Sequence, residues 1–176
     1  DLPQMRQVVR RVRGATHLPV TVKTRLGWDA ASIKIVEVAQ MLQDEGVQAL
    51  AVHCRTRAQG HKGEVDYSWI RRIKAAVQIP VVLNGDIVSP QTARAAFEET
   101  GCDAVMIGRG AMGNPWIFRK SRGSNPIFSA APSAPRFSGK TSFYLVLVLD
   151  FRLKTCFYLV LVWVVRLRTR FYLGLV

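Results

Sequence analysis

The sequence predicts an α/β fold that is part of a (β/α)8 barrel, and three observations support this prediction. Short β-branched runs alternate with amphipathic segments up to Lys120, as in parallel strands joined by crossover helices. Polar residues or glycine follow each strand-like run at similar spacings along the chain. About four such units are present, and a complete barrel needs eight strands and about 250 residues. The expected domain, residues 1–120, is therefore half a barrel; a doubly wound parallel sheet is the alternative.

The first half of this domain contains two helices and two strands. "LPQMRQVVRRVRG" predicts a helix that ends at Gly14, and "PVTVKTR" predicts a strand from Pro19 to about Arg25. A second helix is expected from about Ala30 to Glu45, because apolar residues recur on one face and Gly46 follows as a stop signal. "VQALAVHC" predicts the second strand.

The second half repeats the same unit twice. Residues 67–77 predict a helix with an apolar inner face and a basic outer face, and "IPVVLNG" predicts the third strand. Ser89 and Pro90 suit the N-cap and first position of the next helix, which Gly101 ends. "DAVMIG" predicts the fourth strand, and a short helical turn is expected near "AMGNPWIF".

The carboxyl ends of the four strands carry Lys23, His53, Asn84 and Gly108, at separations of 30, 31 and 24 positions. In a barrel, functional residues gather at these ends, and the loops after the last two strands commonly hold a phosphate. The turns "NGD" (84–86) and "GRG" (108–110) would let the backbone approach an anion, which Arg109 would also contact. Ordinary tight βα turns explain the same residues equally well.

The other strand-end residues have two interpretations each. Lys23 would point into the mouth of a barrel, or it is a solvated lysine. His53 is a core histidine or a site residue, and Arg55 and Arg57 either contact phosphates or are solvated. No second histidine or carboxylate stands at metal-ligand spacing, so we expect no metal.

Charge and cysteine content indicate the kind of partner and the compartment. The chain has 25 Lys and Arg against 12 Asp and Glu, a net charge of +13 that suits a polyanion such as nucleic acid. Cys54, Cys102 and Cys156 form an odd set without CxxC spacing, which argues against a zinc knuckle and a disulfide framework. We expect reduced thiols in a cytoplasmic chain, and we find no secretory signal.

The sequence changes character after residue 120. Residues 121–141 are a Ser- and Pro-rich linker, and residues 142–176 repeat with a period of 14, too short for a known solenoid unit. The longest apolar run is 156–165, well short of the roughly 20 residues of a membrane span. We expect an irregular tail, disordered or a product of translated repetitive DNA, although "FYLVLV" is strand-forming. Seven of the thirteen net positive charges lie here, which weakens the case for nucleic acid.

Four motifs together resemble one family. "VTVKTRLGWD", "AVHCRTRAQGHKGEVDYSWI", "IPVVLNGDI" and "TGCDAVMIGRGAMGNPWIF" are similar, in the same order, to the second half of the catalytic barrel of bacterial-type tRNA-dihydrouridine synthases. The resemblance covers roughly residues 1–120. It implies an FMN-dependent oxidoreductase that reduces a uridine of tRNA to 5,6-dihydrouridine, with NADPH as electron donor.

The resemblance also implies a role for each strand-end residue. Lys23 would lie beside the flavin ring, where a positive charge stabilises the reduced, anionic flavin. His53 would lie along the flavin or substrate side. The phosphate and ribityl end of FMN would be held by Asn84, Gly85, Asp86, Gly108 and Arg109. Arg55 and Arg57 would hold nearby RNA phosphates.

The sequence departs from the family pattern in one respect that concerns catalysis. The family's first FMN-binding turn and its catalytic cysteine belong to the amino-terminal half barrel, and we expect this chain to begin after both. Cys54 and Cys102 fall in the wrong motifs to replace that cysteine, so no catalytic residue is expected here. Another chain would have to supply the missing half. The alternatives are an inactive tRNA-binding remnant and another FMN- or sugar-phosphate-binding barrel.

Overall fold

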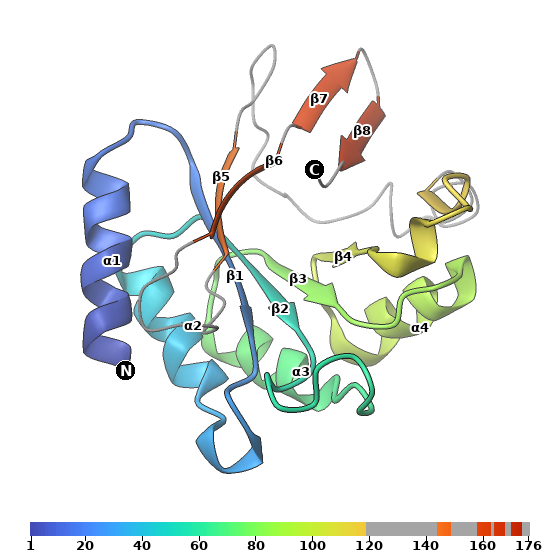
Figure 1. Cartoon of the computed structure of the whole chain (residues 1–176), viewed down its shortest axis with the longest axis horizontal. Coiled ribbons are helices and arrows are strands. Elements are labelled where there is room, and N and C mark those ends of the chain that lie inside the picture. Colours follow the sequence, from blue (N-terminus) through green and yellow to red (C-terminus); the bar gives the residue numbers. More distant parts are fainter. Residues whose placement is uncertain (119–143, 149–157, 163, 168–169, 174–176) are drawn as a thin grey trace.

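The computed structural model describes residues 1–118 and four tail segments, 144–148, 158–162, 164–167 and 170–173. Strands and helices alternate along the first of these ranges (Figure 1). In chain order the elements are α1 (Leu2–Gly14), β1 (Val20–Arg25), η1 (Ala30–Ser32), α2 (Ile35–Asp44), β2 (Ala49–His53), α3 (Ser68–Ala76), β3 (Val81–Asn84), α4 (Pro90–Thr100), β4 (Ala104–Met106) and η2 (Arg109–Ala111).

Strands β1 to β4 are parallel and lie side by side in chain order, β4-β3-β2-β1. Each strand follows a helix that packs beside it, which is the crossover arrangement of an α/β fold. The predicted fold class is confirmed at this level: a parallel sheet with alternating helices, consistent with part of a (β/α) barrel.

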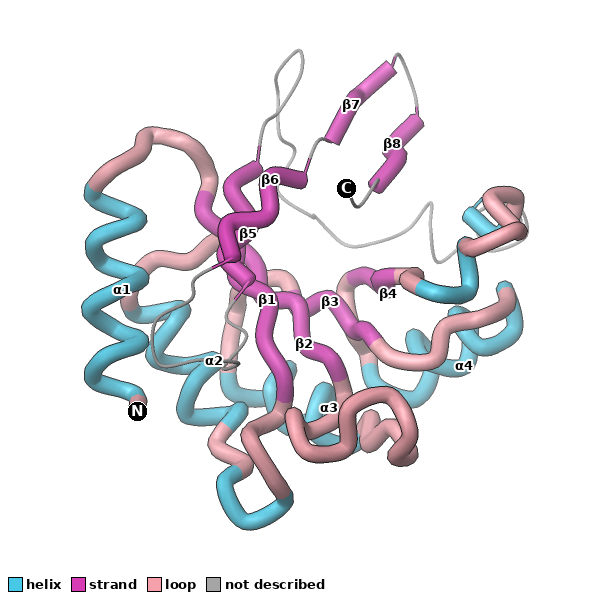
Figure 2. The backbone as a smooth tube through the Cα atoms, in the orientation of Figure 1, coloured by secondary structure: helices cyan, strands magenta, loops and turns pink. Residues whose placement is uncertain are grey.

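The helices run along one side of the strand row, as the backbone trace in Figure 2 shows. Burial alternates along β1, so that Val20, Val22 and Thr24 are buried while the residues between them are half-buried. In residues 1–118, an apolar cluster joins the strands and helices and includes Val22, Leu50, Leu83, Ile35, Leu42, Ile70 and Ile73. The apolar strand face therefore packs on the helices, and the other face carries Lys23 and Arg25.

Caps explain where two of the helices begin and end. Asp1 accepts a hydrogen bond from Gln4 N at the start of α1, at 3.1 Å. Ser89 accepts from Thr92 N at the start of α4 (3.1 Å), and Gly101 ends that helix in the left-handed region at φ 66°. These three boundaries agree with those predicted from the sequence.

The predicted helix from Ala30 to Glu45 is wrong at its amino end. The chain forms the short turn η1 and then α2, because Asp29 and Ser32 cap each other and Ile33 is extended at ψ 114°. A reciprocal cap over three residues closes one turn, and the chain must then leave it before the longer helix can start.

Strands also form in the described segments of the tail, where we expected irregular structure. β5 (Tyr144–Val148) pairs in parallel with β1, and β6 (Tyr158–Val162) pairs antiparallel with β5. β7 (Val164–Leu167) and β8 (Arg170–Leu173) form a separate antiparallel pair. The strand-forming character of "FYLVLV" accounts for this difference. The predicted linker, 121–141, lies outside the described residues.

Candidate functional site

The carboxyl ends of the parallel strands bring the predicted site residues to one edge of the sheet. His53 pairs in register with Arg25 on one side and with Asn84 on the other, and Asn84 pairs with Met106. Lys23 lies two residues before the end of β1, on the same face as Arg25. The last residue of that strand is thus Arg25, whereas the sequence analysis placed Lys23 at the strand end.

His53 is buried among positive charges. The residue is 7% exposed, and burial, followed by the charges of Arg25 and Lys23, lowers the pKa of His53 to about 3. The ring of His61 lies 6.0 Å from that of His53, between centroids. Desolvation and the charge of Arg109 lower the pKa of His61 too. His53 is therefore a neutral hydrogen-bonding group at physiological pH.

Arg25 fixes the loop that follows β2. Its Nη1 donates to the carbonyl oxygens of Thr56 (3.1 Å) and Gly60 (3.0 Å). Arg57 N donates to the carbonyl oxygen of Gly27 at 2.9 Å and Ala58 N to that of Trp28 at 2.8 Å, so backbone hydrogen bonds also join the loops after β1 and β2. Sequence reasoning missed Arg25 and His61. The alternation of faces from Lys23 would have indicated Arg25, whereas His61 carried no signal before the loop was placed.

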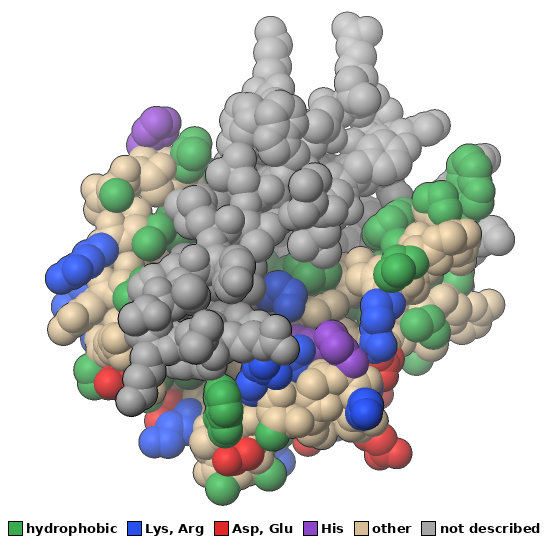
Figure 3. Space-filling model, viewed as in Figure 1, with side chains coloured by type: hydrophobic (Ala, Val, Ile, Leu, Met, Phe, Trp, Pro, Cys, Tyr) green, Lys and Arg blue, Asp and Glu red, His purple; other side chains and the backbone are tan. Residues whose placement is uncertain are grey.

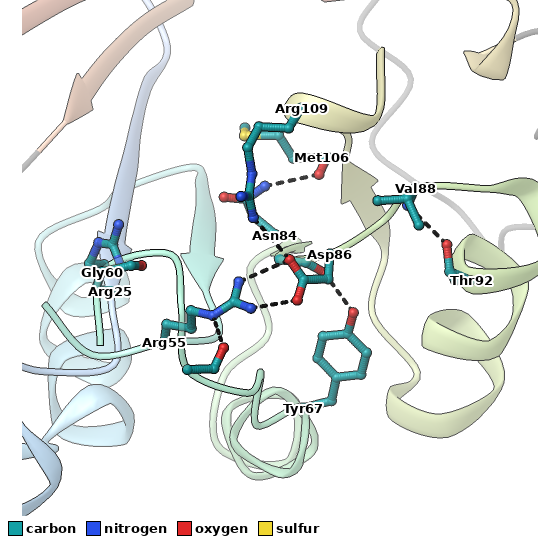
Figure 4. Close-up of polar contacts among 12 residues, drawn as sticks. Arg25, Arg55, Gly60, Tyr67, Asn84, Asp86, Val88, Thr92, Met106 and Arg109 are labelled. Atoms are coloured by element: carbon teal, nitrogen blue, oxygen red, sulfur yellow. Dashed lines mark hydrogen bonds and ion pairs between the residues drawn. The ribbon is translucent and has the colours of Figure 1, made fainter. Parts of the chain in front are cut away.

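Asp86 is the centre of a network of arginines, shown in Figure 4. Arg55 donates to both carboxylate oxygens, from Nη1 to Oδ1 at 3.0 Å and from Nη2 to Oδ2 at 2.5 Å. Arg109 Nη2 donates to Oδ1 at 3.2 Å. Arg55 in particular, with a smaller contribution from Arg109, holds the pKa of Asp86 below its usual range. The carboxylate is thus ionised at neutral pH.

The two arginines expected to contact RNA lie in different surroundings. Arg55 is 3% exposed, and its Nε donates to the carbonyl oxygen of Gly63 at 2.5 Å. Its guanidinium is engaged inside the protein. Arg57 is half-buried in the same loop.

Glycines shape the turns after β3 and β4. Gly85 has φ 136°, and a Cβ at this position would lie 2.8 Å from Val65 Cγ1. Its carbonyl oxygen accepts from the Tyr67 hydroxyl at 2.6 Å, and the neighbouring Asn84 donates from Nδ2 to the carbonyl oxygen of Met106 at 3.0 Å. A Cβ at Gly110 would lie 2.5 Å from the carbonyl oxygen of Ile87. Both turns are held by contacts within the protein.

The comparisons with known proteins decide the family. The model of the dihydrouridine synthase family (Dus) matches residues 3–145. This chain belongs to the dihydrouridine synthase family. The predicted resemblance is confirmed, and the match extends beyond residue 120, where we expected it to end.

Curated relatives of this family member agree with the assignment. The tRNA-dihydrouridine synthase B of Vibrio cholerae is 52% identical over 113 residues, which are 64% of this chain and 35% of that protein. The probable tRNA-dihydrouridine synthase 1 of Synechocystis sp. is 54% identical over 110 residues, 62% of this chain and 31% of that protein. The tRNA-dihydrouridine synthase B of Pseudomonas putida is 51% identical over 114 residues, 65% and 34% of the two chains. This chain spans about a third of the length of these relatives.

Two features of the turn after β4 suit a phosphate group. Among the described residues, no atom beyond its two chain neighbours lies within 4 Å of a Cβ built on the exposed Gly108, so the backbone there is open to a ligand. The side chain of Arg109 is 60% exposed. Basic and histidine side chains gather near the middle of the face in Figure 3. Phosphate groups suit such a combination of open glycine backbone and guanidinium.

The described residues contain neither a cluster suited to a metal ion nor a membrane-spanning helix. No group of three or more His, Cys, Asp and Glu side chains is placed to hold a metal ion in that part of the chain. None of its helices combines the length and apolar character needed to cross a bilayer.

Proposed function

We propose that this chain is the carboxyl-terminal half of the catalytic barrel of an FMN-dependent tRNA-dihydrouridine synthase. The full enzyme would reduce uridine in tRNA to 5,6-dihydrouridine, with NADPH as reductant. The observation that carries the proposal is the meeting of Lys23, His53, Asn84 and Arg109 at one sheet edge in a chain of this family. FMN, when bound, would deliver a hydride to the uracil ring and be reduced again by NADPH.

The turns after β3 and β4 would hold the phosphate and ribityl end of FMN. Asn84, Gly85 and Asp86 belong to the first turn, and Gly108 and Arg109 to the second. The open backbone at Gly108 supports this assignment, as does the exposed guanidinium of Arg109. A charge-assisted hydrogen bond to phosphate contributes about 1.5–3 kcal/mol.

Lys23 and His53 would lie along the flavin ring and the substrate. The positive charge of Lys23 would stabilise the reduced, anionic ring. The neutral imidazole of His53 can donate from one nitrogen and accept at the other, which suits the polar edge of a flavin or a uracil.

The proposed macromolecular partner is tRNA, and the chain would act in the cytoplasm. The names of the relatives and the positive charges of Lys23 and Arg25 at the end of β1, beside His53, support the partner. The uridine would have to leave the tRNA stack, at a cost of a few kcal/mol. We keep the proposed contact to RNA phosphates for Arg57, since the guanidinium of Arg55 is already paired with Asp86.

The first FMN-binding turn and the catalytic cysteine would belong to the other half of the barrel, which residues outside 1–176 would supply. Among the described cysteines, Cys54 and Cys102 are both buried, and burial raises the pKa of Cys54 to about 12. Neither is suited to protonate a uracil, so we assign no catalytic residue to this chain.

Flavin binding by the purified full chain tests the proposal. Titrations followed by flavin fluorescence should show that FMN binds at least about tenfold more tightly than riboflavin, because only FMN offers a phosphate to Arg109. Equal affinities, or a preference for ribose 5-phosphate over FMN, would contradict an FMN site and favour a sugar-phosphate barrel.

Co-expression tests the activity. The chain would be produced together with the amino-terminal part of the Vibrio cholerae relative in cells that lack dihydrouridine, and tRNA would be analysed by mass spectrometry. We expect a uridine that has gained two hydrogens when both parts are present, and none with either part alone. Unmodified tRNA from cells that contain a stable complex of the two parts would count against the proposed activity.

A further inference from the structure

A buried arginine, a carboxylate and an exposed arginine form one chain of contacts from the core to the surface. We propose that Arg55 and Asp86 are positioning residues that hold Arg109 in place for a phosphate group and do not bind the phosphate themselves. The identity of that phosphate, the one of FMN, rests on the proposed function.

Arg55 is the fixed end of this chain. Its side chain is 4% exposed, and three of its nitrogens donate to the carboxylate of Asp86 and to the carbonyl oxygen of Gly63. A two-pronged guanidinium–carboxylate contact sets both the distance and the plane of the partner. Arg55 therefore determines where the carboxylate of Asp86 lies.

Asp86 is the middle of the chain and is held from its backbone as well. It has φ 47°, in the left-handed region, directly after Gly85 at φ 136°. The Tyr67 hydroxyl donates to the carbonyl oxygen of Gly85 at 2.6 Å, which ties this turn to the start of α3. Three N–H groups from Arg55 and Arg109 already donate to the two carboxylate oxygens of Asp86. A carboxylate so occupied is an anchor for cations and would repel a phosphate placed directly against it.

Arg109 is the exposed end. It reaches Asp86 with Nη2 at 3.2 Å, while 60% of its side chain is open to solvent. Arg55 and Asp86 neutralise each other, so the net positive charge of the three residues resides on Arg109. Fixing a flexible arginine before the ligand arrives reduces the entropy lost on binding. The network thus presents one oriented cation at the ligand edge.

A double-mutant cycle on the full chain tests this arrangement. Asp86→Asn and Arg109→Met should each weaken FMN binding by about tenfold or more and leave riboflavin binding unchanged. The double variant should bind FMN within about twofold of Arg109→Met, because Asp86 acts only through Arg109. The proposal would be overturned if the loss of FMN affinity in the double variant equalled the product of the losses in the two single variants. Tighter FMN binding by Asp86→Asn would overturn it too.

Two further variants distinguish the positioning role of Arg55 and Asp86 from a general effect of net charge and from a loss of folding. Glu99→Gln removes a carboxylate from the exposed ion pair with Arg71 and should leave FMN binding unchanged. Arg55→Lys keeps the buried charge but loses the two-pronged contact, and it should weaken FMN binding with an unaltered circular dichroism spectrum. If Arg55→Lys binds FMN as the wild type does, Arg55 has no positioning role.

A measurement without flavin distinguishes this inference from the proposed function. Nitrogen-15 relaxation of Arg109 Nε should show an ordered side chain in the wild type and a mobile one in Asp86→Asn, with Arg57 Nε as the internal reference. A wild type that does not bind FMN would refute the proposed function alone. An Arg109 side chain that is equally ordered with and without the Asp86 carboxylate would refute the positioning role.

Discussion

The two ends of the four parallel strands are held together in different ways. At the amino ends, single polar side chains pair with the backbone: Gln43 Oε1 accepts from the amides of Gln78 (2.5 Å) and Ile79 (3.2 Å), and Asp103 Oδ2 accepts from Val81 N (2.7 Å). At the carboxyl ends, Lys23, Arg25 and Arg55 surround a neutral histidine. Side chains pair with backbone groups at both ends, and the carboxyl end in addition concentrates positive charge around His53.

This difference separates stability from binding along one sheet. Pairing an amide with a side-chain oxygen stabilises the fold, because an unpaired amide costs about 1–3 kcal/mol. Like charges at one edge repel each other, and they are useful only when an anion neutralises them. The same division between the two ends of the strands is general among (β/α) barrels. Substitutions at the two ends should therefore affect different measurements.

The largest expected effect is an exception to this division. Gly85→Ala lies at the carboxyl end but should lower the free energy of unfolding by about 3 kcal/mol, since φ 136° strains an alanine and its Cβ would lie 2.8 Å from Val65 Cγ1. Urea denaturation followed by circular dichroism measures the change. Gly14→Ala, in the last turn of α1 with open space around its Cβ, is the control and should not lower the free energy of unfolding. Equal losses in both variants would show that the local geometry is wrong.

The second prediction concerns the amino end. Asp103→Ala removes the acceptor of Val81 N and of Lys74 Nζ, both at 2.7 Å, and should destabilise the fold by about 2 kcal/mol. FMN affinity of the folded variant should equal that of the wild type, because the change lies at the far end of β3 and β4. Impaired flavin binding at a temperature where the variant is fully folded would break the proposed separation of the two ends.

The smallest expected effect at neutral pH comes from His53. Its pKa is lowered from 6.5 to about 3 in the folded chain, so below pH 6.5 the unfolded chain takes up a proton that the folded chain does not. The contribution of the uncharged His53 to the free energy of unfolding is therefore fully present above pH 6.5. It is lost toward pH 3, by at most about 1.4 kcal/mol per pH unit.

Urea denaturation between pH 7 and pH 4.5, above the range in which Asp86 titrates, measures this slope. His53→Gln should flatten the profile. His61→Gln should flatten the profile less, because His61 is exposed and loses less hydration on folding than the buried His53. A wild-type stability that does not change over this range would mean that His53 is not desolvated.

Most of the fold could be predicted because local signals were strong. Ser89, Pro90 and Gly101 marked both ends of α4, and the β-branched runs placed the strands within a few residues. The helix expected from Ala30 failed because Asp29 and Ser32 close their own turn. That cap resembles an ordinary helix start in the sequence, and only the extended Ile33 shows that the helix does not continue.

The site could be predicted less completely, since it depends on register and on side-chain pairing. The sequence indicated that Asn84, Asp86 and Arg109 follow the strands, and all three lie at the carboxyl edge. It did not indicate that Arg55 turns inward to Asp86, because a loop arginine is usually solvated. The positions of Arg25 and His61 followed only once the strands were aligned and the loop after β2 was placed.

The contact between Gly110 and the backbone of the preceding turn has a further consequence. A Cβ at Gly110 would lie 2.5 Å from Ile87 O and 2.9 Å from Val88 Cα, so the two turns touch without side chains between them. Adding or deleting a residue in either turn would displace the other and shift Asp86 relative to Arg109. Designers who wish to change the ligand specificity of this edge must therefore rebuild the two turns together.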